Sequence, residues 1–200
     1  MHIQPPSESI YRRLGYREGI TRINPKQRDQ IERHIKEALG LIVLKGVVRR
    51  MPIQKKKGSA LTLAPKIILS SQRLSEFIGN CDELVVMGAT AGDKIMKVLY
   101  RESAGKNLTA AVVYDAVASE MVDASLDWIM DFCNQQLRRE NKQLTTNRFS
   151  AGYGDFLLEN QKLMYDILAL GELGISLTDR CILKPEKSVT AIAGIQGVGK

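Results

Sequence analysis

The chain has 200 residues, of which 44% are hydrophobic and 26% are charged, and its formal net charge is +7 at pH 7. This composition predicts a soluble globular protein of one domain, or one domain with an arm, since no apolar run approaches the roughly 20 residues of a membrane span and the amino terminus does not resemble a secretory signal. The three cysteines are far apart and have no histidine partners, which argues against a disulfide framework or a metal site and favours the reducing cytoplasm.

The positive charge is spread along the chain in short groups. These groups are Arg12-Arg13, Arg49-Arg50, Lys55-Lys56-Lys57 and Arg138-Arg139. A basic surface attracts nucleic acid, anionic membranes or acidic proteins. Since no aromatic residues are interleaved with these groups, nucleic-acid recognition is the least favoured interpretation. We expect a solvated basic face or a docking surface for an acidic protein, and neither nucleic acid nor a membrane as a partner.

Helices are predicted for the amino-terminal part. Ser7 begins a short helix that ends near Gly15. Asn24 and Pro25 favour the start of a second helix, because Asn can cap a helix and Pro suits its first position. Apolar residues then recur at helical spacing, at Ile31, Ile35, Ala38, Leu39 and Ile42.

Short apolar runs predict strands in the middle of the chain. The predicted strands cover residues 46–54, 61–63, 67–69 and 84–88. Between the first two, residues 55–59 predict a turn or mobile loop. Short helices are expected over residues 71–78 and from about residue 93 to Arg101.

The longest helical pattern extends from Leu108 to about Glu140, as one helix or two. The elements predicted after it are an extended segment at 144–149, a tight loop at 150–155, a helix at 157–170 and strands at 181–183 and 189–195. Strands and helices follow no regular βαβ order, which predicts an α+β fold with a twisted, mainly antiparallel sheet packed with helices. We expect residues 1–45 to form a helical arm and residues 46–200 to form this α+β domain.

The tight loop is the most informative candidate for a binding site. Arg148 ends an extended segment, where a guanidinium can hold a carboxylate through two parallel hydrogen bonds. Gly152 and Gly154 would let a ligand approach the backbone, and Tyr153 offers an aromatic face and a hydroxyl. Such a loop could hold a small zwitterion with an aromatic part, although an ordinary glycine-rich hairpin has the same composition.

Acidic residues follow one another along the long helix. They are Asp115, Glu120, Asp123, Asp127 and Asp131. Several are three or four residues apart and so share a face. Without a histidine nearby they do not predict a metal site. They form either a solvated acidic stripe or, where one member lies in a cleft, a site for a cation or an amine.

Four motifs of the carboxy-terminal half occur in one order. They are Arg148-x-Ser150-x-Gly152-Tyr153, Leu158-Glu159-Asn160-Gln161, Gly174-Ile175-Ser176-Leu177-Thr178-Asp179 and Lys187-Ser188-Val189-Thr190-Ala191-Ile192. This order resembles the activation domain of cobalamin-dependent methionine synthase. The likeness is strongest over about residues 110–195, and the short stand-alone members of the family also carry an amino-terminal helical piece.

The resemblance implies a ligand and the residues that bind it. In this family the domain binds S-adenosylmethionine (SAM) in a shallow groove. By resemblance, Arg148 would engage the SAM carboxylate, and the backbone of Ala151 and Gly152 would contact the ligand. Tyr153 would belong to the same contact and line the edge that faces the corrinoid. Asp123 would accept from the SAM ammonium or lie near the sulfonium.

The sequence departs from the large synthases at three places. Lys142 stands where they have an acidic residue, and Ala151 stands where they have Pro. They also carry a ligand-binding Asp near the start of the domain, which has no counterpart in residues 1–50.

The resemblance also implies an activity and partners. One electron, from a flavodoxin or another acidic donor, restores the reduced corrinoid, and SAM then methylates it. No Asp-x-His-x-x-Gly motif for cobalamin occurs in the sequence, so we expect the cobalamin on a corrinoid-binding methyltransferase subunit that this chain serves in trans. The chain would position the ligands and contribute no catalytic acid, base, nucleophile or metal ligand. The alternative is a partner or chaperone module that binds a corrinoid protein without SAM.

Overall fold

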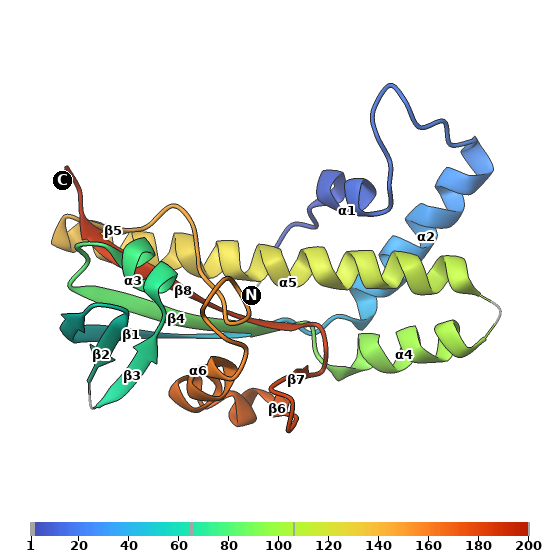
Figure 1. Ribbon diagram of the computed structural model, residues 1–200. Coiled ribbons are helices and arrows are strands. Elements are labelled where there is room, and N and C mark those ends of the chain that lie inside the picture. Colours follow the sequence, from blue (N-terminus) through green and yellow to red (C-terminus); the bar gives the residue numbers. More distant parts are fainter. Residues whose placement is uncertain (1–2, 65, 106, 200) are drawn as a thin grey trace.

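The computed structural model describes residues 3–64, 66–105 and 107–199 (Figure 1). The helices are α1 (Ser7–Arg13), α2 (Pro25–Leu41), α3 (Gln72–Ile78), α4 (Asp93–Ala104), α5 (Leu108–Leu137) and α6 (Asn160–Leu168), with short 3-10 helices η1 (Arg138–Glu140) and η2 (Leu170–Leu173). The strands are β1 (Lys45–Lys57), β2 (Ala60–Leu63), β3 (Ile67–Ser70), β4 (Glu83–Thr90), β5 (Lys142–Leu144), β6 (Ser176–Leu177), β7 (Leu183–Lys184) and β8 (Ser188–Gly197).

Six strands form one sheet in the order β3-β2-β1-β4-β8-β5, and every neighbouring pair is antiparallel. Helix α5 lies along one face of this sheet and α6 lies on the other (Figure 1). Strands β6 and β7 form a separate small hairpin. The predicted α+β fold with a mainly antiparallel sheet is therefore confirmed.

Strand β4 shows why its sequence is a continuous apolar run. Leu84 and Val86 pack into the cluster that contains α3 and α6, whereas Val85 and Met87 pack against α5. A strand with both faces covered needs apolar residues at every position. At Gly88, an added Cβ would lie 3.1 Å from side-chain carbons of α6 and η2, so the glycine allows these elements to pack closely.

The prediction of a turn or mobile loop over residues 55–59 is wrong for residues 55–57. Strand β1 continues to Lys57 and pairs with β2, with Lys57 opposite Ala60, so that only Gly58 and Ser59 form the turn. The three lysine side chains are exposed, which lets the strand continue without burying their charge.

The pattern over residues 108–140 is one unbroken helix, α5, followed by η1. Helix α2 begins as expected, with Asn24 and Gln27 forming a capping box. Helices α1, α2 and α4 share a buried cluster with the first half of α5, and Ile10 of α1 is completely buried there. The predicted helix over 157–170 is shorter, because its first residues form turns and it ends at Leu168.

Candidate functional site

The segment that carries the predicted binding motif is fixed to the edge of the sheet beyond β5. The Phe149 N–H donates to the carbonyl oxygen of Ile192 at 2.8 Å, and the Ile192 N–H donates back at 2.7 Å. The Ser150 hydroxyl donates to the carbonyl oxygen of Thr190 at 2.9 Å. Arg148 therefore projects from a backbone that β8 holds in place.

The loop over residues 150–156 closes tightly on a buried anchor. Gly152 has a φ of +91°, which favours glycine, and its N–H donates to the carbonyl oxygen of Phe156 at 2.7 Å. Phe156 is fully buried between the sheet and α6. At Gly154, an added Cβ would lie 2.6 Å from the side chain of Arg73. The loop is thus a packed structure with its tip, Tyr153, 68% exposed.

Asp155 joins this loop to α3. Its carboxylate accepts from the Ser71 hydroxyl at 2.6 Å and from the Gln72 N–H at 2.6 Å, with the Arg73 N–H at 3.3 Å. The hydrogen bond from Ser71, followed by those from the two backbone N–H groups, lowers the pKa of Asp155. The loop is therefore anchored on both sides of Tyr153.

A hollow of about 430 Å³ lies between α5, this loop and residues 181–190, and we refer to it as the groove. Four of the five predicted binding residues line it: Asp123, Arg148, Ala151 and Tyr153. Gly152, the fifth, is not among the lining residues but lies between two that are. Folding thus brings a carboxylate of α5 and the arginine of the loop to one concave surface.

Arg148 is half-buried and paired. Its Nη1 donates to the carboxylate of Asp127, one turn of α5 beyond Asp123, and lies 3.8 Å from the sulfur of Met130. The sequence did not predict the pairing with Asp127. Because a guanidinium has five N–H donors in a planar fork, one pairing leaves others for a ligand.

Asp123 is only loosely paired. Burial raises its pKa, Arg148 opposes that shift, and smaller contributions come from Glu120, Arg13 and Asp127. Its one ion pair among the described residues is with Arg13 of α1, at 3.8 Å. Asp123 is therefore an anion whose charge is incompletely compensated within the protein.

The floor of the groove is polar, a feature that was not predicted from the sequence. The side-chain amide of Gln161 contacts the buried Thr190 hydroxyl, with Nε2 at 2.9 Å and Oε1 at 3.1 Å. The Ser188 hydroxyl donates to Thr90 at 2.8 Å. The signal available in the sequence was the pair Ser188 and Thr190 at the start of a mainly apolar strand. Hydroxyl groups buried in such a strand need hydrogen-bond partners.

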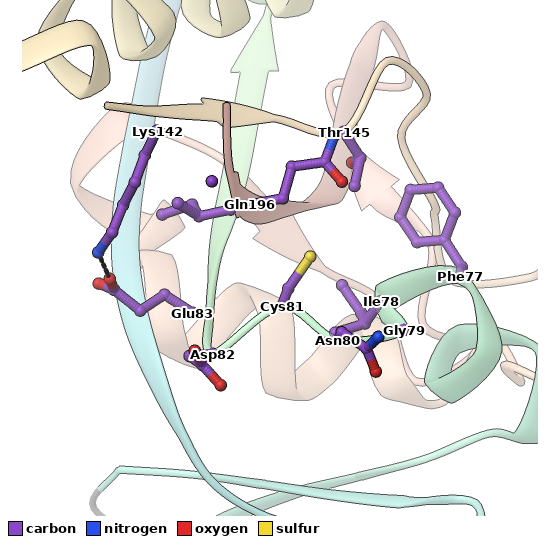
Figure 2. A pocket seen from close by; sticks show the side chains of 12 residues that line it. Phe77, Ile78, Gly79, Asn80, Cys81, Asp82, Glu83, Lys142, Thr145 and Gln196 are labelled. Atoms are coloured by element: carbon purple, nitrogen blue, oxygen red, sulfur yellow. Dashed lines mark hydrogen bonds and ion pairs between the residues drawn. The ribbon is translucent and has the colours of Figure 1, made fainter. Parts of the chain in front are cut away.

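Lys142 lies in a different part of the molecule from the groove. It lines a second hollow of about 440 Å³, together with Cys81 and Glu83 (Figure 2). Its Nζ lies 2.5 Å from a carboxylate oxygen of Glu83, which is also paired with Arg50. The exchange of an acidic residue for Lys142 therefore changes this ion cluster and not the lining of the groove.

Within residues 3–64, 66–105 and 107–199, no group of three or more His, Cys, Asp or Glu side chains is arranged to hold a metal ion. Among the helices of that same part of the chain, none is long and apolar enough to cross a membrane.

Comparisons with known proteins give one kind of match. No protein-family model matches the chain, and neither does any curated protein. Among solved structures, it is similar to the crystal structure of the MetH reactivation domain bound to AdoHcy, with a TM-score of 0.68 and 13% sequence identity. The match covers 92% of this chain and 71% of that one. At this identity the likeness concerns architecture, and it confirms that this chain has the fold of the MetH reactivation domain.

Proposed function

We propose that the chain is a SAM-binding module that supports the reductive remethylation of a corrinoid held by a partner protein. The observation that carries the proposal is the groove, where Arg148 and Asp123, 25 positions apart, face one hollow beside the backbone of Ala151. The MetH reactivation domain, whose fold the chain shares, was crystallised with AdoHcy, the product that SAM becomes after losing its methyl group.

The chemistry of the groove fits the amino-acid end of SAM. That end is a zwitterion, and a guanidinium beside a carboxylate offers one partner for each of its charges. The free N–H groups of Arg148 would bind the SAM carboxylate, and Asp123 would accept from the ammonium. The volume of about 430 Å³ lies in the range of small-molecule sites, which is roughly 300–1,000 Å³.

In the proposed reaction, the protein contributes position rather than acid–base chemistry. Transfer of a methyl group from a sulfonium moves no proton, so no general acid or base is required. The corrinoid, held by the partner, would supply the nucleophile for the methyl group, and the electron pair of the broken carbon–sulfur bond would stay on the sulfur of AdoHcy. Two anchors on the amino-acid end and a rigid loop would hold the methyl group at the open side of the groove, where orientation lowers the barrier.

The exposed rim supports a role with a partner protein. Tyr153 and Ile182 line the groove and yet are 68% and 43% exposed. Exposed apolar groups around a hollow are typical of surfaces that another macromolecule covers. We propose a corrinoid-binding methyltransferase subunit as that partner, acting in trans, with a cytoplasmic location. The net charge of +7 would favour association with an acidic electron donor such as a flavodoxin.

The alternative is a module that binds the corrinoid protein without SAM. The pairing of Arg148 with Asp127 favours it, because a ligand carboxylate would have to share or displace that partner.

Isothermal titration of the chain with SAM tests the proposal. We expect saturable binding that Arg148→Ala weakens by roughly 10- to 100-fold, the effect of losing a hydrogen-bonded charged group. Arg139→Ala is the matched control, because Arg139 is exposed and forms no ion pair among the described residues. No binding by the folded wild-type chain would overturn the SAM-binding function in favour of the alternative. Equal loss in both variants would show that Arg148 has no specific role.

A further inference from the structure

The amino-terminal helix α1 reaches the rim of the groove. Ile10 buries its side chain in the cluster formed with α2, α4 and α5, and the Tyr11 hydroxyl donates to Glu32 of α2 at 2.6 Å. These contacts fix α1 beside the middle of α5, as Figure 1 shows. The last residue of α1, Arg13, therefore has a defined position.

Arg13 is directed at the acidic face of α5. Its Nε donates to Glu120 at 2.5 Å, and its Nη2 lies 3.8 Å from Oδ2 of Asp123. Glu120 is the tighter partner and holds the guanidinium in place. Asp123 therefore lies between two arginines. Arg13 approaches it from α1, and Arg148 lines the groove with it.

The charges around Asp123 do not balance. The two arginines, Arg13 and Arg148, face three carboxylates of α5, which are Glu120, Asp123 and Asp127. One negative charge is left over, and SAM, with a sulfonium, an ammonium and a carboxylate, carries one net positive charge. The cluster is therefore complementary in charge to SAM only while Asp123 is ionised.

We propose that Arg13 is a positioning residue of the SAM site, which keeps the Asp123 carboxylate ionised and directed so that it can accept the ligand ammonium. This inference rests on the proposed function and extends the site to the amino-terminal arm. Burial favours the protonated, uncharged form of Asp123; Arg148 offsets that preference most, and Arg13 adds a smaller contribution from α1. Without Arg13, Asp123 would become protonated at a higher pH and would lose the ammonium as a partner there.

Other titratable and charged groups also face Asp123 and must be considered. They are Glu120 and Asp127 on α5, Arg148 and Tyr153 on the loop, and Cys181 and Glu186 across the groove. Of these groups, Glu120 is also a partner of Arg13, so a shift measured in an Arg13 variant reports on the contacts of Arg13 with Glu120 and Asp123 together.

Titration of Asp123 by carbon-13 NMR, without ligand, is the first test. We expect the midpoint of Asp123 to move to higher pH in Arg13→Gln and to return toward the wild-type value in Arg13→Lys. Arg12→Gln is the matched control, because Arg12 is the neighbouring residue of the same helix and pairs with Glu8. An unchanged midpoint in Arg13→Gln would overturn the inference, whether or not the chain binds SAM.

SAM titration across pH is the second test. We expect Arg13→Gln to weaken SAM binding by roughly two- to fivefold near pH 5.5, the range of a partly exposed ion pair, and to leave it unchanged near pH 8. The same substitution should have no effect in an Asp123→Asn background. Weakening by an equal factor at every pH, or persistence of the effect in that background, would show a merely structural contact. No SAM binding by the wild type would instead overturn the proposed function and leave the NMR result standing.

Discussion

Two hollows of nearly equal volume, about 430 Å³ and 440 Å³, show what distinguishes a candidate site from a structural cluster. In the second hollow, Glu83 and Lys142 belong to an ion cluster with Arg50 and Glu140. Both carboxylates receive two hydrogen bonds from Arg50, at 2.5–2.7 Å. Two cations meet two anions, so that cluster has no charge left for a ligand.

The groove differs in pairing rather than in size. Asp123 has a single ion pair, at 3.8 Å, among the described residues, and in the cluster around it three carboxylates of α5 meet only two arginines. The pKa values agree with this difference in pairing. The Arg50 hydrogen bonds lower the pKa of Glu83 to about 2, whereas burial raises the pKa of Asp123. A surface whose charges are all paired stabilises the fold. A surface with an unpaired negative charge is suited to bind a cationic ligand.

The largest expected difference between the two hollows is in thiol reactivity, because each contains one cysteine. Cys81 in the second hollow is buried, and burial raises its pKa, as it does for Cys133. Each unit by which a thiol pKa rises lowers the reactive thiolate fraction about tenfold at neutral pH. Cys181 lines the groove and is partly exposed. We expect a thiol reagent to modify Cys181 at least about tenfold faster than the other two.

Mass spectrometry of the labelled chain measures the labelling rate of each cysteine. Adding SAM tests whether the ligand covers Cys181. Saturating SAM should slow the labelling of Cys181 and leave Cys81 unaffected, since Cys81 lies in the other hollow. A Cys181→Ser variant should take up almost no label over the same time. Rapid labelling of Cys181 that SAM does not slow, in a chain that binds SAM, would place the ligand elsewhere.

The elements of this fold were predictable where one local pattern was strong. The apolar run of β4 and the long periodicity of α5 predicted their elements because both are covered by neighbours along their length. The lysines of β1 carry no such pattern, and pairing with β2 keeps them in a strand. Pairing with β2 and exposure to solvent decide that these lysines form a strand, and neither property can be derived from the local sequence.

The candidate site was predictable only in part. A resemblance in the motif pointed to Arg148 and Asp123, but the contact of Arg13 with Asp123 joins positions 110 residues apart in sequence. The same holds for Gln161 and Thr190, which pair across the floor of the groove. Such contacts arise from the packing of α1 and α6, and short motifs carry no information about that packing.

The next expected effect separates stability from binding. Arg50→Ala leaves Glu83 and Glu140 facing Lys142 alone, so we expect the free energy of unfolding to fall by about 1 kcal/mol, as for a partly exposed ion network. SAM affinity should not change. Arg148→Ala should do the reverse, with a large loss of affinity and little change in stability. Urea unfolding and titration calorimetry on both variants measure this, and a loss of SAM affinity in Arg50→Ala would contradict the separation of the two hollows.

The smallest expected effect is the dependence of stability on acid. The Arg50 hydrogen bonds lower the pKa of Glu83 and of Glu140 to about 2. A carboxyl whose pKa is lower in the folded than in the unfolded chain stabilises the fold above its unfolded pKa, about 4.3, and loses that contribution as the pH falls toward 2. We expect the urea midpoint to decrease between about pH 4.5 and pH 2, and to decrease less in Arg50→Ala.

Asp123 should act with the opposite sign, which makes it the sharpest control. Its pKa is raised by burial, so the folded chain binds its proton at a higher pH than the unfolded chain does, and acid favours the fold through this group. Asp123→Asn removes that opposing contribution, and we expect the decrease in the urea midpoint to become slightly steeper. A shallower decrease in Asp123→Asn would show that Asp123 is held as a paired anion like Glu83, and the difference between the two hollows would then rest on shape alone.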